Sequence, residues 1–197
     1  MFFRDTYRGV YGEDEPNVGE KYAGFVAEAC EQAAARNAGE TGVAGFFIES
    51  GMSVAGVILP PPGYLAAAYE HVRAAGGVCV ADEVQVGFGR FGKHYWGFQQ
   101  QGVTPDIVTM GKPFGNGMPL AAVVTTLAVS ESFNNGLEYF NTFGGNPVCA
   151  AAGLAVMEII EEEDLQEHAL KVGDHLIASL TALMEKYPVI GAVRGSG

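Results

Sequence analysis

The chain has 197 residues, of which 48% are hydrophobic and 28 are glycine, a composition that suits a globular α/β protein with many tight turns. Its formal net charge of −12 argues against a nucleic-acid-binding protein, because such proteins normally present a basic surface. No apolar run approaches the roughly 18 to 20 residues of a membrane helix, which argues against a membrane-spanning protein.

The first half of the chain is expected to form two helices and two short strands. Apolar residues recur at helical spacing over residues 19–37 and again over residues 64–75. Residues 43–48 form a short continuous apolar run, as expected of a strand that is buried on both faces of a sheet. Residues 78–81 are predicted to form a second strand.

The second half continues the alternation of strands and helices. Strands are predicted at residues 107–110 and 120–125, and helices at residues 147–162 and 165–187. Helices that alternate with short buried strands indicate βαβ units, so we predict an α/β fold with a mostly parallel sheet. The start of a further strand is expected at residues 189–193.

The cysteine and histidine residues give no sign of a metal site. Cys30, Cys79 and Cys149 are far apart in the sequence and lie in apolar segments, which is typical of buried free thiols. The four histidines show none of the spacings that metal ligands adopt. We therefore expect no bound metal.

Polar residues directly follow the predicted strands. Glu49 follows the first strand, and Lys112 follows the third. Asp82, Glu83 and Gln85 follow the second strand. Ligands of open parallel sheets bind outside the carboxyl ends of the strands, so these residues are candidates for a binding site. Their positions alone are equally compatible with a structural ion pair between a carboxylate and the lysine.

The two stretches that contain most of these residues, 82–92 and 105–112, resemble the signature of class III aminotransferases, which depend on pyridoxal 5'-phosphate (PLP). The resemblance implies fold type I of the PLP-dependent transferases. It also implies that Lys112 forms a Schiff base with PLP and then serves as the proton-transfer base. By the same resemblance, Asp82 pairs with the ring nitrogen and Gln85 contacts the hydroxyl side of the ring.

Two further residues are expected to contact the cofactor by this resemblance. Glu49 is one of them. The other is Thr142, which lies in the glycine-rich segment 138–147. In the family, the matching threonine donates a hydrogen bond to the PLP phosphate of the neighbouring subunit, a suitable task for a hydroxyl. The resemblance therefore implies a homodimer with a shared active site.

Two other phosphate-binding motifs fit the sequence less well. Residues 87–92 match the pattern G-x-G-x-x-G, but no helix is expected to begin directly there, which disfavours a dinucleotide site. Gly111 and Lys112 occur in the order found in a P-loop. However, Pro113 stands where Ser or Thr is needed, and Asp106 stands where the earlier glycine belongs.

Several stretches are similar to the phospho-lyase branch of the family. This branch contains ethanolamine-phosphate phospho-lyase and 5-phosphohydroxy-L-lysine phospho-lyase, and it was once described as alanine–glyoxylate aminotransferase 2-like. The similar stretches are residues 5–9, 49–50, 111–117 and 138–142, within a resemblance that extends over residues 5–197. Residues 51–53, Gly-Met-Ser, depart from the Met-Gln-Ser run of close relatives, and we expect them near the substrate.

The branch resemblance implies elimination of phosphate and ammonia from a phosphorylated amine, such as phosphoethanolamine or 5-phosphohydroxylysine. The alternative within the same family is an ω-aminotransferase that passes the amine to a keto acid such as glyoxylate or pyruvate. Relatives of this branch are often mitochondrial, so an intracellular, mitochondrial protein is expected.

The chain is expected to be an internal fragment of a longer protein. Residues 1–162 would form part of the large PLP-binding domain, and residues 163–197 the connecting helix and the start of the small C-terminal domain. The family's glycine-rich phosphate loop and the aromatic residue that stacks on the ring are expected upstream. An inactive truncated product is therefore a third alternative for the function.

Overall fold

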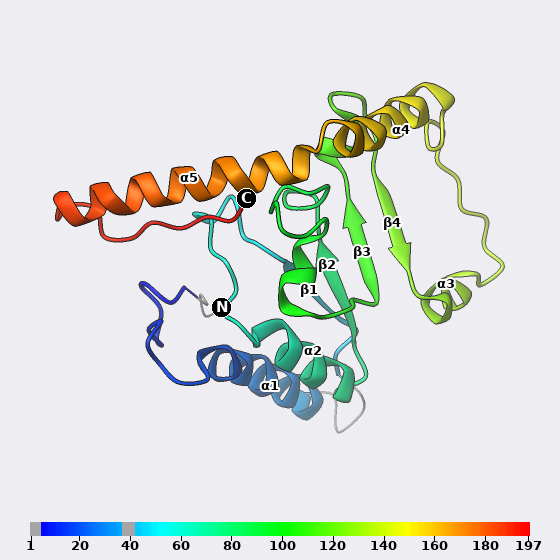
Figure 1. The fold of residues 1–197 in the computed structure, drawn as a ribbon. Coiled ribbons are helices and arrows are strands. Elements are labelled where there is room, and N and C mark those ends of the chain that lie inside the picture. The colour runs from blue at the N-terminus through cyan, green and yellow to red at the C-terminus, as the bar shows by residue number, and fades with distance from the viewer. Residues whose placement is uncertain (1–4, 37–41) are drawn as a thin grey trace.

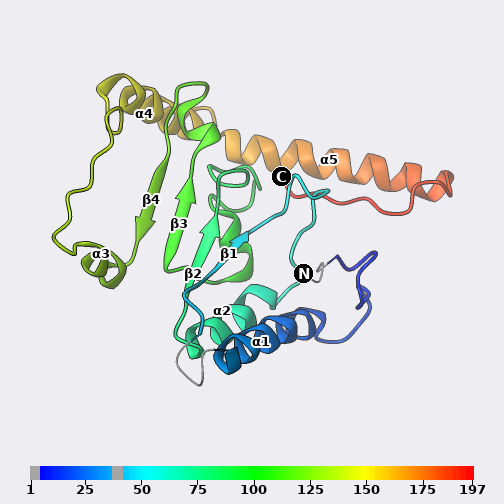
Figure 2. The same ribbon diagram turned by 180° about the vertical axis from the view of Figure 1, so that it is seen from behind.

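The computed structural model describes residues 5–36 and 42–197, which form a four-stranded sheet with helices packed around it (Figures 1 and 2). The strands are β1 (Gly45–Glu49), β2 (Val78–Asp82), β3 (Ile107–Met110) and β4 (Ala122–Thr125). They lie in the order β1-β2-β3-β4, with β4 antiparallel to β3 and the other neighbours parallel. The predicted α/β fold with a mostly parallel sheet is confirmed.

Two helices from the first half of the chain cover one face of the sheet beside β1 and β2. These helices, α1 (Val18–Arg36) and α2 (Tyr64–Ala74), pack against each other, and α2 also packs against β2. The core between them is apolar and aromatic, and its largest fully buried members are Tyr22, Leu65, Tyr69, Val72 and Cys79. Burial of these side chains anchors the amino-terminal half of the sheet.

The second half of the chain adds three further helices. They are α3 (Leu127–Phe133), α4 (Pro147–Glu162) and α5 (Leu165–Lys186), and α5 extends past the sheet as one long rod (Figure 1). The amino-terminal turn of α4 is capped by Asn146, whose side chain accepts a backbone hydrogen bond from the first turn. In the described ranges, no helix is both long enough and apolar enough to cross a membrane.

The other predicted elements agree with the structure to within two residues at each end. The first helix was expected to end at Asn37, which lies outside the described residues. Cys30, Cys79 and Cys149 are buried free thiols, as predicted. α3 was not predicted, since its seven residues are too few to show a clear helical repeat.

The predicted strand at residues 189–193 is wrong. This segment is irregular, and the carboxyl-terminal tail runs back beside α5 (Figure 1). The tail packs closely there, because a Cβ atom added at Gly173 of α5 would meet the Gly197 carbonyl oxygen at 2.2 Å. A strand needs a partner strand for its backbone hydrogen bonds, and the tail does not lie beside the described sheet.

The expectation that residues 43–48 are buried on both faces is also wrong. Ile48 is 5% exposed, whereas Phe47 is 74% exposed. β1 is at one edge of the described sheet, and α2 covers only the face on which Phe46 meets Tyr69 in an edge-on ring contact at 6.4 Å. Because side chains alternate along a strand, Phe47 points to the face that α2 leaves open.

Candidate active site

The carboxyl ends of the parallel strands bring three polar residues side by side. Glu49 at the end of β1 pairs in register with Asp82 at the end of β2, and Asp82 pairs with Thr109 of β3. The Asp82 carboxylate accepts a hydrogen bond from the backbone N–H of Val84 at 3.0 Å, which closes a tight turn directly after β2. The predicted convergence of acidic groups at this edge is therefore present in the fold.

Lys112 begins the short turn η2 (Lys112–Gly115) after β3. Its φ of +38° places it in the left-handed region, which non-glycine residues adopt at a cost. The turn is held from two sides. The ring of Phe114 stacks on Phe88 with centroids 5.0 Å apart, and α4 packs on the turn where Gly153 leaves room for Phe114 and Leu120.

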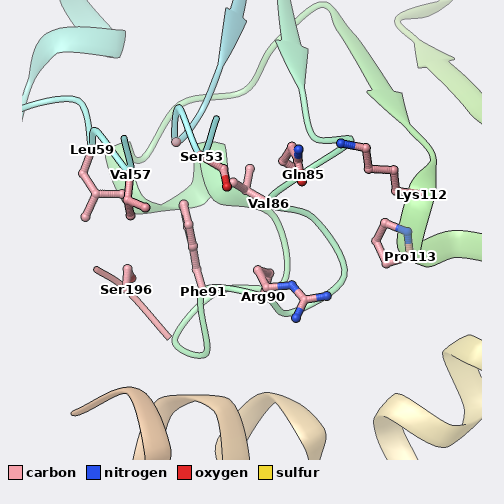
Figure 3. Close-up of a pocket in the computed structure, with 11 residues that line it drawn as sticks. Ser53, Val57, Leu59, Gln85, Val86, Arg90, Phe91, Lys112, Pro113 and Ser196 are labelled. Carbon is pink, nitrogen blue, oxygen red and sulfur yellow. The ribbon is translucent and has the colours of Figure 1, made fainter. Parts of the chain in front are cut away.

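Lys112 and Gln85 line the same cavity, which has a volume of about 330 Å³. Figure 3 shows the Lys112 side chain extending toward Gln85. The cavity lies between the segment after β1, the turn after β2 and the turn after β3, and the carboxyl-terminal tail adds Ser196. Gly51 and Ser53 also line it, so the 51–53 stretch lies beside the cavity. Its expected place near the substrate stays a prediction.

Glu83 directly follows Asp82 and does not itself line the cavity. Its side chain is fully buried, and Ser50 Oγ donates a hydrogen bond to its Oε1 at 2.6 Å. The backbone N–H groups of Gly97 and Phe98 donate to its two carboxylate oxygens at 2.7 Å and 3.0 Å. Burial raises the pKa of Glu83, and these three donors counteract part of that rise. The carboxylate thereby fastens the segments after β1 and β2 to each other.

The sequence predicted that Glu83 follows the second strand but did not predict its buried hydrogen bonds. Side chains alternate in direction along a strand, so Glu83 could have been expected to point away from Asp82. Asp82 is half-buried at the strand edge, whereas Glu83 is buried and bonded on the other side. Arg90 and Phe91 of the following turn also line the cavity, and neither was singled out from the sequence.

Thr142 does not lie at this cavity. It is an exposed residue of the segment between α3 and α4, which runs on the far side of β4 from β1 (Figures 1 and 2). Glu49 and Asp82 lie at the strand edge but do not line the cavity itself. The described chain therefore gathers Glu49, Asp82, Gln85 and Lys112 at one edge and leaves Thr142 apart.

Comparison with protein families matches residues 11–197 to the class III aminotransferase family. Among curated proteins, the chain is 49% identical to the alanine–glyoxylate aminotransferase 2-like protein of Drosophila melanogaster, over 98% of this chain and 39% of that protein. It is 52% identical to the human mitochondrial alanine–glyoxylate aminotransferase 2, over 79% of this chain and 30% of that protein. The chain thus spans well under half the length of these relatives.

Solved structures show the same fold. A phospholyase from Arthrobacter in complex with phosphoethanolamine is 41% identical, with a TM-score of 0.87 over 98% of this chain and 45% of that chain. An ω-transaminase from Pseudomonas jessenii in complex with PMP is 33% identical, with a TM-score of 0.86 over 99% of this chain and 43% of that chain. Both likenesses extend over the sheet and the candidate site.

The residues at the strand edge fit the ring end of PLP. The donor set contains a primary amine on Lys112 and a carboxylate on Asp82, which are groups that PLP enzymes place around the ring, and an amide on Gln85. The Asp82 carboxylate is oriented by the Val84 N–H, and it forms no ion pair with any lysine, arginine or histidine of residues 5–36 and 42–197. It therefore remains available to a protonated ring nitrogen.

Proposed function

Because this chain belongs to the class III aminotransferase family, whose enzymes depend on PLP, we propose that it carries the lysine-bearing part of a PLP-dependent phospho-lyase site. The substrate would be a phosphorylated amine such as phosphoethanolamine or 5-phosphohydroxylysine. The observation that carries the proposal is the placement of Lys112 and Gln85 in one cavity at the strand edge where Asp82 ends β2. The 41% identity to a phospholyase in complex with phosphoethanolamine supports the phosphorylated substrate.

Each residue has a task that follows from its chemistry. Bound PLP supplies an electron sink for the substrate carbon that carries the amine. Asp82 would keep a proton on the ring nitrogen, since a carboxylate favours a neighbouring cation. Lys112 would hold the cofactor through its amine and, once the substrate amine displaces it, take the proton from the amine-bearing carbon. Gln85 and Glu49 would orient the ring from the sides.

The elimination balances without an added oxidant or reductant. Lys112 takes one proton, and the bond between the adjacent carbon and the phosphate oxygen breaks, with the electron pair leaving on phosphate. The unsaturated amine that remains takes up water and gives an aldehyde and ammonia. For phosphoethanolamine, the sum is substrate plus water to acetaldehyde, ammonia and phosphate.

An ω-aminotransferase is the second candidate. The observation that favours it is the 52% identity to a human protein named alanine–glyoxylate aminotransferase 2. The 33% identity to an ω-transaminase in complex with PMP points the same way. In that case Lys112 would return the proton to the cofactor rather than let phosphate leave, and a keto acid such as glyoxylate or pyruvate would accept the amine.

A homodimer is proposed as the assembly, with Thr142 directed to the cofactor phosphate of the other subunit. Thr142 lies among aromatic side chains that lack cover in the described chain. Tyr139, Phe140 and Phe143 are 74%, 77% and 81% exposed. Exposed apolar clusters of this kind mark protein–protein contacts.

The same exposure supports the alternative that these 197 residues alone are inactive. Loss of stable dimers in a Phe140→Ser, Phe143→Ser double variant of the complete protein would support the assembly, and unchanged dimers would contradict it.

A mitochondrial location is proposed on the strength of the relatives. The human relative is named as mitochondrial, and so is a relative from Arabidopsis thaliana that is 50% identical over 98% of this chain and 38% of that protein. Import of the complete protein into isolated mitochondria, with protection from added protease, would test it.

The proposed reaction is tested with the complete PLP-loaded protein. It is incubated with phosphoethanolamine or 5-phosphohydroxylysine in the absence of a keto acid, and released phosphate is measured. We expect phosphate and aldehyde in equal amounts, and a fall of about 10²- to 10⁴-fold in the Lys112→Ala variant. No phosphate release, together with ready amine transfer to glyoxylate or pyruvate, would contradict the lyase and establish the aminotransferase.

A further inference from the structure

We propose that Arg90 is the specificity-determining residue of this site, and that its guanidinium binds the phosphate group of the substrate. The inference rests on the proposed function, because it names the part of the protein that recognises the phosphorylated end of the amine. Lys112 would act at one end of the substrate and Arg90 at the other. Ser53 and Ser196 would add hydroxyl donors.

The first support is location. Arg90 lines the cavity of about 330 Å³ that Lys112 and Gln85 also line. Figure 3 shows its guanidinium reaching from the turn after β2 toward the side of the cavity where Pro113 lies, next to Lys112. A planar guanidinium presents a fork of N–H donors that matches two oxygens of a phosphate, which a lysine ammonium does not.

The second support is the rigidity of the turn that carries Arg90. Gly89 and Gly92 flank it with φ values of +75° and +67°, and the Gly92 N–H donates to the Gly89 carbonyl at 2.9 Å. The Gly89 N–H in turn donates to the Tyr95 carbonyl at 2.9 Å. Positive φ is the conformation that glycine adopts without strain, so this turn is built to hold its shape.

The turn of Arg90 is also joined to the turn of Lys112. Phe88, two residues before Arg90, is 7% exposed and stacks on Phe114, two residues after Lys112. The interplanar angle is 26° and the centroids are 5.0 Å apart. Because the two turns share this ring contact, the distance between the lysine and the arginine is set by packing rather than by flexible loops.

The third support is that the Arg90 guanidinium has no polar partner within the described ranges. Arg73 is paired with Asp106 at 3.2 Å, and Arg194 donates to the Gly56 carbonyl. The side chain of Arg90 forms no hydrogen bond or ion pair with any of residues 5–36 and 42–197. In a chain with a net charge of −12, an unpaired arginine beside a lysine forms a local positive site for an anion.

Hydroxyl groups complete the site. Ser53 lines the cavity from the segment after β1, and Ser196 lines it from the carboxyl-terminal tail. Ser196 Oγ accepts a hydrogen bond from Gln100 Nε2 at 3.0 Å, so its own proton remains free to donate into the cavity. A phosphate monoester offers three oxygens, enough for the guanidinium and both hydroxyls.

The phosphate of PLP is also a phosphate monoester, so the experiment separates the two sources. The complete PLP-loaded protein is compared with its Arg90→Gln and Arg90→Lys variants. Arg36→Gln, which removes the same charge at the exposed end of α1, is the control. Retention of PLP is measured by absorbance and by release on denaturation. The substrates are phosphoethanolamine and n-propylamine, which lacks the phosphate.

We expect Arg90→Gln to raise the KM for phosphoethanolamine about 10- to 100-fold, the range for loss of a charge-assisted hydrogen bond. Arg90→Lys should fall between Arg90→Gln and the unmodified protein. The rate at which n-propylamine reacts with the bound cofactor should differ less than about 2-fold between Arg90→Gln and the unmodified protein. Arg36→Gln should resemble the unmodified protein. Equal losses for both amines, or loss of PLP from Arg90→Gln, would overturn the proposal.

Inorganic phosphate tests the binding of phosphate by Arg90 independently of lyase activity. It should compete with n-propylamine in the unmodified protein, and this competition should weaken about 10- to 100-fold in Arg90→Gln. If the unmodified protein releases no phosphate from phosphoethanolamine, the lyase function fails, and this competition still tests the anion site. Equal competition in both proteins would refute binding of phosphate by Arg90.

Discussion

Ser50 Oγ donates a 2.6 Å hydrogen bond to the buried carboxylate of Glu83, and this bond joins the ends of two neighbouring strands. The two residues are separated by 33 positions in the sequence, and they directly follow Glu49 of β1 and Asp82 of β2. The backbone N–H groups of Gly97 and Phe98 donate two further hydrogen bonds to the same carboxylate. One carboxylate therefore joins the segments that follow β1 and β2 to the segment at residues 97–98.

Replacement of Glu83 by glutamine is expected to destabilise the complete protein by about 1–3 kcal/mol, although it removes a buried charge. The amide nitrogen of glutamine would face the N–H of Gly97 or Phe98, and two donors cannot bond to each other. Denaturant unfolding measures the loss. Glu70→Gln, on the exposed side of α2, is the control and should stay within about 0.5 kcal/mol. Equal stability of the two variants would contradict this role of Glu83.

The contribution of Glu83 should also depend on pH. Its pKa is raised in the folded protein, chiefly by burial, so the folded state binds the proton more tightly than the unfolded state. The contribution is fully present below the ordinary glutamate pKa of about 4.3 and declines as pH rises through the raised folded value. The difference in unfolding free energy between the unmodified protein and Glu83→Gln should therefore shrink over that window. A difference that grows with pH would show the opposite sign.

Two glycines of α1 should respond in opposite ways to the same substitution. At Gly19, an added Cβ would lie 2.1 Å from the Pro62 carbonyl oxygen, which is backbone and cannot move aside alone. At Gly24, no atom lies within 4 Å of the added Cβ. We expect Gly19→Ala to lower the thermal midpoint, whereas Gly24→Ala should add about 0.5–1 kcal/mol through helix propensity. The same direction of change in both would refute the close contact of α1 with Pro62.

Cys79 should be inert toward thiol reagents in the native protein. Burial raises the pKa of its thiol to about 11, and the Sγ contacts the Tyr69 carbonyl oxygen at 3.8 Å. Reaction requires the thiolate, so alkylation with iodoacetamide at pH 8 should leave Cys79 unmodified. Mass spectrometry of the peptide that contains Cys79 checks this, with the denatured protein as the control. Rapid modification of the native protein would contradict the buried position.

The position of the candidate site could be predicted from the sequence because it depends on topology. The carboxyl ends of parallel strands meet at one edge, so residues such as Asp82 and Lys112 had to approach one another once the strands were identified. The resemblance to class III aminotransferases, now supported by the family match, supplied the chemistry. The roles of the individual residues stay predictions.

Other features depend on side-chain geometry or on strand order, and sequence patterns do not contain either. The bond between Ser50 and Glu83 requires a particular pair of side-chain directions. The exposure of Phe47 follows from the edge position of β1, which an apolar run does not indicate. Arg90 was missed because a cavity becomes visible only when three separate turns are placed in space.

The left-handed backbone of Lys112 has a consequence for the stability of this protein. Lys112 has a Cβ atom and is held at φ +38°, a conformation that lowers the free energy of unfolding. The strained residue is the one that the proposed reaction needs most. Two variants can therefore separate the loss of the Lys112 amine from the relief of backbone strain. Lys112→Gly should be more stable than the unmodified protein, while Lys112→Ala keeps the strain, and both lose the amine. Under the proposed function, the protein gives up stability at this position to hold a reactive group in place.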